Sequence, residues 1–99
     1  MKAQLDISYL GLVRNVLGCQ GEKIEATPGL TIRNLLEILV EKHGEPFRAS
    51  VFKSEGKLRS TTLVCVNDRD IDELEGFETK LESGEKISVV VGVYPPEGG

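Results

Sequence analysis

The residues best suited to chemistry lie at the C-terminal end of the sequence, where an aromatic residue, two prolines and an acid precede two glycines. They are Tyr94, Pro95, Pro96, Glu97, Gly98 and Gly99. Two residues without a Cβ atom can enter a tunnel too narrow for any side chain, and they would present the α-carboxylate of Gly99 to another enzyme's active site. Prolines stop a strand and favour polyproline II, so they hold such a tail away from a sheet. The alternative is a frayed polar chain end.

Other residue types that could do chemistry do not form a known catalytic pattern. The sequence has no Gly-x-x-x-x-Gly-Lys-Ser/Thr phosphate loop and no Gly-x-Ser-x-Gly nucleophile turn. Its one histidine, His43, is expected in the last turn of a helix, where the helix dipole favours a positive charge or a donor. Cys19 and Cys65 have no second Cys or His at metal-ligand spacing. Carboxylate pairs such as Asp70 and Asp72 are ordinary at this acid content. We therefore expect a protein that is not an enzyme and binds no metal or cofactor of its own.

Length, composition and charge restrict the class of protein. The 99 residues, of which 39% are hydrophobic, are enough for one core. We expect residues 1–94 to form one domain and residues 95–99 to form a flexible C-terminal tail. The net charge of −4 comes without a basic cluster, which argues against nucleic acid as a partner. No apolar run approaches the roughly 20 residues of a membrane-spanning helix. Asp6 interrupts the start that a signal peptide would need, so the expected location is the cytoplasm.

Apolar periodicity predicts an α+β fold with the element order ββαββ. Alternating residues predict strands over residues 2–9 and 22–26, and β-branched runs predict strands over residues 61–66 and 87–93. Apolar residues at helical spacing predict a helix from Thr31 to His43. This helix is the element that must cover the sheet.

The segments between these elements are predicted to be connections and turns. Thr31 is expected to cap the helix, although Asn34 stands where a complete capping box would have Glu or Gln. Gly44 and Pro46 are expected to end it. We expect connections over residues 10–21 and 45–60, with turns at residues 54–56 and 67–70, and a short fifth strand near Ile71 or Lys80.

One helix can cover only one face of a sheet, so the other face is expected to be open. Alternation in the last strand puts Ile87, Val89, Val91 and Val93 on one side and Ser88, Val90, Gly92 and Tyr94 on the other. The side with the serine and glycine is the better candidate for the open face. Exposed Val90 and Tyr94 would then form part of a partner surface. The alternative is that they are isolated surface residues.

Several segments together carry a resemblance to a known family. They are Lys57-Leu58-Arg59, Leu63-Val64-Cys65-Val66-Asn67-Asp68-Arg69-Asp70-Ile71, Leu74-Glu75-Gly76, Thr79, Leu81, Gly84-Glu85 and Gly98-Gly99. With the helix from Thr31 and the opening strand, they resemble the ThiS/MoaD ubiquitin-like sulfur carriers, most closely the molybdopterin synthase small-subunit type. The resemblance implies a β-grasp fold: a mixed sheet of four or five strands, one main helix on one face, and adjacent first and last strands.

The resemblance also implies a chemistry for the tail. A ubiquitin-activating-type adenylyltransferase would adenylate the Gly99 carboxylate with ATP, because a carboxylate oxygen leaves poorly until it is part of a mixed anhydride. Conversion to a thiocarboxylate would follow. Gly98 is then the slender neighbour that admits Gly99, and Pro95, Pro96 and Glu97 complete the entering tail.

Three functions follow as alternatives. The first is a sulfur carrier for molybdopterin or tungsten-pterin biosynthesis, with the large subunit of molybdopterin synthase as a partner. The second is a protein modifier joined through Gly99 to target lysines, and the third is a β-grasp domain that binds partners non-covalently. Thirteen residues follow Lys86 (99 − 86 = 13). This length exceeds the usual one in the family and favours conjugation over a synthase pocket.

Overall fold

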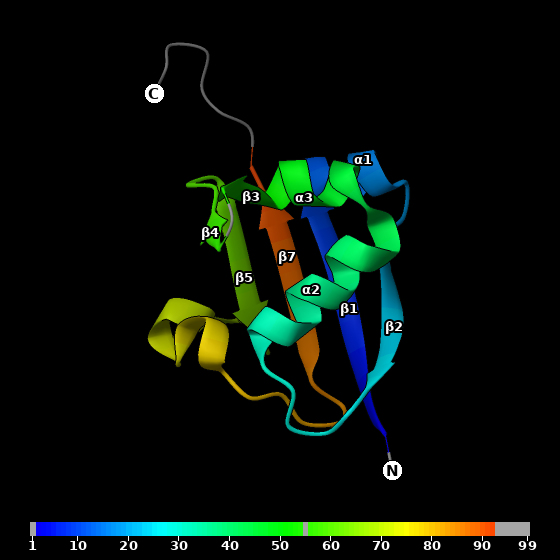
Figure 1. Ribbon diagram of the computed structural model, residues 1–99, viewed down its shortest axis with the longest axis vertical. Helices are drawn as coiled ribbons and strands as arrows, with labels where there is room; N and C mark the ends of the chain where they lie inside the picture. The colour runs from blue at the N-terminus through cyan, green and yellow to red at the C-terminus, as the bar shows by residue number, and fades with distance from the viewer. Residues whose placement is uncertain (1, 55, 93–99) are drawn as a thin grey trace.

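The computed structural model describes residues 2–54 and 56–92. Its elements in chain order are β1 (Ala3–Gly11), α1 (Leu12–Leu17), β2 (Gly21–Ala26), α2 (Ile32–His43), α3 (Glu45–Val51), β3 (Phe52–Ser54), β4 (Lys57–Leu58), β5 (Thr62–Val66), β6 (Arg69–Asp70), the 3₁₀ turns η1 (Ile71–Glu73) and η2 (Gly76–Glu78), and β7 (Lys86–Val91). Figure 1 shows α2 crossing in front of the sheet, with α1 and α3 at the end where β1 and β7 finish. The tail residues Tyr94 to Gly99, and the last residue predicted for the final strand, Val93, lie outside the described residues.

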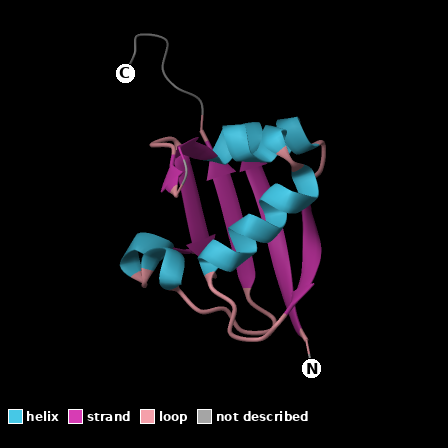
Figure 2. Cartoon of the chain, in the orientation of Figure 1, coloured by secondary structure: helices cyan, strands magenta, loops and turns pink. Residues whose placement is uncertain are grey.

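The main sheet has the strand order β2-β1-β7-β5-β6, and Figure 2 shows helices crossing in front of its strands. The first and last strands pair in parallel in its centre, with Ile7 opposite Ile87 and Tyr9 opposite Val89. The other pairings are antiparallel, including that of β1 with β2. The prediction of a mixed sheet with adjacent first and last strands is confirmed.

The predicted main helix is confirmed from Ile32 to His43. It buries the side of the helix that carries Leu35, Leu36 and Leu39 against the inner face of the sheet. The expectation about its N-terminus was incomplete, because Asn34 does complete a capping box. The Asn34 amide N–H donates to Thr31 Oγ1 at 3.2 Å, while the Thr31 amide N–H donates to Asn34 Oδ1 at 3.2 Å. An amide oxygen at this position can accept as a Glu carboxylate does.

The prediction of simple connections over residues 10–21 and 45–60 was wrong. Residues 12–17 form α1 and residues 45–51 form α3, followed by the β3–β4 pair. Their helical periodicity extends over fewer than two turns, too few to show in an apolar pattern. Pro46, which was expected only to stop α2, also occupies the first turn of α3, a position that suits its fixed φ and missing N–H. Both helices contribute to the core, through Val13, Phe47 and Val51.

The region after β5 also differs from expectation. Asn67 and Asp68 form the predicted turn, both with positive φ (50° and 71°), whereas Arg69 and Asp70 pair with β5 as the fifth strand of the sheet. The fifth strand was expected near Ile71 or Lys80, and it ends just before Ile71. Lys80 instead makes an isolated bridge to Thr31.

Candidate functional site at the open sheet face and the chain exit

The sheet face opposite α2 carries a row of apolar side chains at the end where β7 finishes. Leu10 of β1 lies opposite Val90 of β7, and Val90 in turn lies opposite Leu63 of β5. Leu10 is 44% exposed and Leu63 is 41% exposed, while Val90 between them is half-buried. The prediction that Val90 faces the open side is confirmed, because its neighbours Val89 and Val91 are buried in the core. We call Leu10, Val90 and Leu63 the apolar row.

A polar row lies next to the apolar row on the same face. Ser88 of β7 pairs with Ser8 of β1 and with Cys65 of β5. Burial raises the pKa of the Cys65 thiol, and nearby carboxylates, Asp70 most strongly, raise it further. A raised pKa keeps the thiol protonated and therefore a poor nucleophile. Cys65 is thus suited to packing rather than to sulfur chemistry.

The chain leaves the described structure beside the apolar row. Val91 ends β7, and the Gly92 amide donates a 2.8 Å hydrogen bond to the carbonyl of Thr61. At the same end, Gly11 has φ +78° and approaches β7 so closely that a Cβ atom there would lie 2.0 Å from the Val91 carbonyl oxygen. Only glycine fits both requirements. A partner protein that binds residues 93–99 would therefore lie next to the apolar row.

The inner side of the sheet holds a polar cluster that sequence reasoning missed. Glu22 of β2 lies between the ends of β1 and α2, with only 13% of its side chain exposed. The Tyr9 hydroxyl donates to Glu22 Oε2 at 2.5 Å, and Nε2 of His43 lies 2.5 Å from the same oxygen. Lys42 donates to Glu22 Oε1. His43 was expected only to serve the helix dipole, and its partner could not be recognised because Glu22 lies on a different element 21 positions earlier.

The electrostatics of this cluster favour an ionised carboxylate and a neutral phenol. Burial alone would raise the pKa of Glu22, but the hydrogen bonds from its three partners outweigh burial and lower the pKa to about 2. Burial, and then the hydrogen bond to Glu22, raises the pKa of Tyr9 far above its usual range. The phenol therefore stays protonated and donates to the carboxylate. The arrangement fastens the C-terminal end of α2 to the sheet.

Metal and membrane sites are not evident in the described part of the chain. Among residues 2–54 and 56–92, no three His, Cys, Asp or Glu side chains gather in a way that could hold a metal ion. Within the same residues, no helix has the length and apolar content needed to cross a membrane.

Comparisons with solved structures define the class of fold. Small archaeal modifier protein 1 from Haloferax volcanii superimposes with a TM-score of 0.78 at 18% identity, covering 92% of this chain and 99% of that one. A Pyrococcus furiosus protein named as subunit 1 of a molybdopterin converting factor superimposes with a TM-score of 0.72 at 24% identity, covering 92% and 99%. The expected fold class is confirmed: the molecule is an α+β protein with the ubiquitin-like β-grasp fold.

Sequence comparison then gives the family. The model of the ThiS family matches residues 7–95, and the chain belongs to this family. A relative in Archaeoglobus fulgidus, which carries the name of a sulfur carrier protein, is 31% identical over 61 residues that cover 62% of this chain and 68% of the relative. The resemblance stated from the sequence is therefore confirmed at the level of the family. Sulfur carriers of this family are small carrier proteins rather than catalysts.

Proposed function

We propose that this protein is a sulfur carrier whose Gly99 carboxylate is adenylated and then converted to a thiocarboxylate. The family match over residues 7–95 carries the proposal, and the name of the Archaeoglobus fulgidus relative supports it. A ubiquitin-activating-type enzyme would be the partner, and ATP its co-substrate. Because ATP drives the activation, the proposal implies a cytoplasmic location.

The proposed chemistry proceeds by acyl activation. A carboxylate oxygen of Gly99 attacks the α-phosphorus of ATP, which releases pyrophosphate and leaves a mixed anhydride with AMP. The sulfur of a persulfide donor attacks the acyl carbon and displaces AMP. A second thiol then attacks the donor's sulfur in the resulting acyl disulfide, which forms a disulfide with the donor and releases the thiocarboxylate on Gly99. The protein supplies the reacting end, and Gly98 lets that end enter the active site.

The open sheet face is proposed as the docking surface for the activating enzyme. When residues 93–99 enter the active site of the activating enzyme, that enzyme would lie next to the end of β7. Leu10, Val90 and Leu63 are exposed or half-buried there. Apolar residues of this kind at the centre of an interface contribute most of its affinity. Tyr94, the other residue predicted for this surface, lies outside the described residues and stays a prediction.

The acceptor of the sulfur is proposed to be the molybdopterin pathway. The likeness to the Pyrococcus furiosus molybdopterin converting factor subunit supports this choice at the level of the fold. The likeness to small archaeal modifier protein 1 supports the second candidate, conjugation of Gly99 to target lysines. A third candidate, a purely non-covalent interaction domain, would use the open face and leave Gly99 unmodified.

Intact mass spectrometry tests the proposal. Incubation of the full chain with its cognate activating enzyme, ATP and a persulfide donor should raise the mass by about 16 Da, the difference between a sulfur and an oxygen atom. The variant Gly98→Val should keep the fold and gain no mass, because the added side chain blocks entry. An unchanged mass of the parent chain with an active enzyme would reject the carrier mechanism.

Conjugation leaves a different product in cell extracts. Lys86 is the last tryptic site before Gly99, so a conjugated lysine would carry the whole segment from Ile87 to Gly99 as a branch. Detection of that branched peptide after enrichment would establish the modifier role. If the branched peptide is absent and the mass increase is observed, only the sulfur-carrier function remains.

A further inference from the structure

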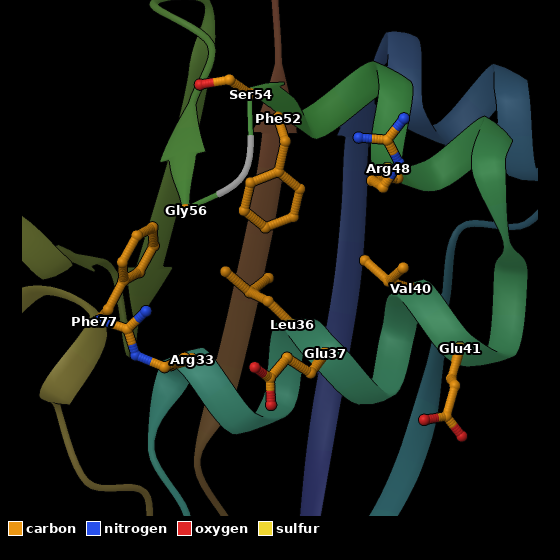
Figure 3. Close-up of a pocket in the computed structure, with 10 residues that line it drawn as sticks. All are labelled: Arg33, Leu36, Glu37, Val40, Glu41, Arg48, Phe52, Ser54, Gly56 and Phe77. Carbon is orange, nitrogen blue, oxygen red and sulfur yellow. The ribbon is translucent and has the colours of Figure 1, made fainter.

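A groove of about 540 Å³ lies on the helix side of the molecule, remote from the open face (Figure 3). Leu36 and Val40 of α2 line its floor, Phe52 of β3 lies above Leu36, and Phe77 of η2 lies at the Arg33 end. The Phe52 ring points toward Leu36, and the Phe77 ring lies beside Arg33 at the edge of the same space. The groove thus has apolar walls over most of its length.

The chemistry of the groove suits an extended, proline-rich segment with a negative end. Aromatic-lined grooves bind prolines in polyproline II conformation, because the rings pack flat and no backbone N–H needs a partner. At the Phe77 end, the Arg33 guanidinium lies over the ring with 5.2 Å between its carbon and the ring centroid, and it pairs with Glu78. Arg33, in its ion pair with Glu78, thus places a guanidinium at the Phe77 end of the groove.

Residues 93–99 have this composition, and they begin close to the groove. Gly92 is hydrogen-bonded to Thr61, the neighbouring Thr62 donates from Oγ1 to the Val51 carbonyl at 3.1 Å, and Phe52 follows Val51 in the chain. Two hydrogen bonds thus link Gly92, the last described residue, to the segment that precedes Phe52 in the groove wall.

The length of this segment matches the groove. At about 3.1 Å per residue, the seven residues from 93 to 99 span roughly 22 Å in polyproline II. The stretch of α2 along the groove, residues 33–41, rises about 12 Å at 1.5 Å per residue. The segment can therefore cross β3 and still extend from Phe52 to Arg33. Glu37 and Glu41 stand along the α2 rim, so a carboxylate is better placed at the Arg33 end than beside them.

We propose that residues 93–99 dock reversibly in this groove of their own chain. Pro95 and Pro96 pack against Phe52, and the Gly99 carboxylate lies toward Arg33. The docking itself does not depend on the proposed function. Its consequence does: a docked tail withholds Gly99 from the activating enzyme, and the apparent affinity for that enzyme falls in proportion to the undocked fraction.

Nuclear Overhauser measurements on the full chain test the docking directly. We expect contacts between the ring protons of Pro95 or Pro96 and those of Phe52, within one molecule. A mixture of isotope-labelled and unlabelled chains separates these from contacts between copies. Contacts only between copies would overturn the proposal in favour of tail exchange, and the absence of any such contact in the unmodified chain would overturn it outright.

Variants provide a second measurement. The double change Pro95→Gly and Pro96→Gly should shift the resonances of Phe52, Val40 and Phe77 and leave the open face unchanged. Val90→Asp is the matched control and should shift open-face resonances without moving those of the groove. If the proline double variant leaves the groove resonances in place, the tail does not occupy it. No activating enzyme is present in these experiments, so failure of thiocarboxylation and failure of docking are distinguishable.

Discussion

The Tyr9 hydroxyl donates a 2.5 Å hydrogen bond to Oε2 of Glu22, the same oxygen that contacts His43. We expect Tyr9→Phe to destabilise the protein by about 1.5–3 kcal/mol, the usual contribution of a hydrogen bond to a charged group. The phenyl ring remains, so packing against Phe47 is retained. Urea denaturation followed by circular dichroism measures the loss.

A double-mutant cycle is the control for this change. In a Glu22→Gln background the acceptor charge is already gone, so Tyr9→Phe should cost less than in the parent chain. Equal costs in both backgrounds would show that the hydroxyl does not act through Glu22.

The same cluster predicts acid sensitivity. The pKa of Glu22 is lowered from 4.5 to about 2 in the folded protein. The ionised carboxylate therefore contributes fully to the free energy of unfolding above the unfolded pKa, and this contribution is lost as pH falls from about 4.5 through 2. The shift corresponds to about 3 kcal/mol at most. Denaturation midpoints measured from pH 7 to pH 2 should fall less steeply for Glu22→Gln than for the parent chain. Parallel curves would contradict the assignment.

The open face should govern docking without governing stability. Leu63 in the apolar row is 41% exposed, and Ile38 on α2 is 36% exposed, so the two residues form a matched pair. Leu63→Asp should weaken binding of the activating enzyme about thirtyfold, or roughly 2 kcal/mol, whereas Ile38→Asp should leave it unchanged. Calorimetric titration measures both, and melting curves check that both variants fold. Equal effects would remove the open face as the docking surface.

Two glycines with positive φ should respond differently to substitution, because Gly18 is in the left-handed helical region (ψ 18°) whereas Gly11 has ψ −143°. Gly11 and Gly18 have φ of +78° and +73°, but a Cβ atom would meet the Val91 carbonyl only at Gly11, while nothing lies within 4 Å at Gly18. Gly18→Ala should cost about 1 kcal/mol from strain alone. Gly11→Ala should cost clearly more, because its backbone angles lie outside the left-handed helical region and because β1 or β7 must move to relieve the contact with Val91. Chemical denaturation of the two variants compares them, and similar losses would mean that the contact relaxes freely.

The sequence predicted the elements whose side chains alternate or repeat over many residues. The strand faces of β7 were predictable because Ser88 and Gly92 interrupt one side of an otherwise apolar run. α2 was predictable because its apolar stripe extends over three turns. The tail residues Gly98 and Gly99 were prominent from their type alone, and their structural role stays a prediction.

The missed features depend on contacts between distant segments. α1 and α3 are too short to show periodicity, and α3 has in its first turn Pro46, which from the sequence indicated only the end of the preceding helix. The full extent of the apolar row could be recognised only from the strand register, which places Leu10 and Leu63 beside Val90. The groove could be found only once the structure had placed the β3–β4 pair and η2 beside α2. None of these relations has a local pattern in the chain.

The position of β7 between β1 and β5 has a mechanical consequence. An enzyme that pulls on the C-terminal end applies force along the strand axis, while the hydrogen bonds on both sides of β7 run across it. Such a load shears all of these bonds together instead of peeling them apart one by one. The segment whose end is proposed to react is therefore anchored in a strand that resists extraction along its own axis.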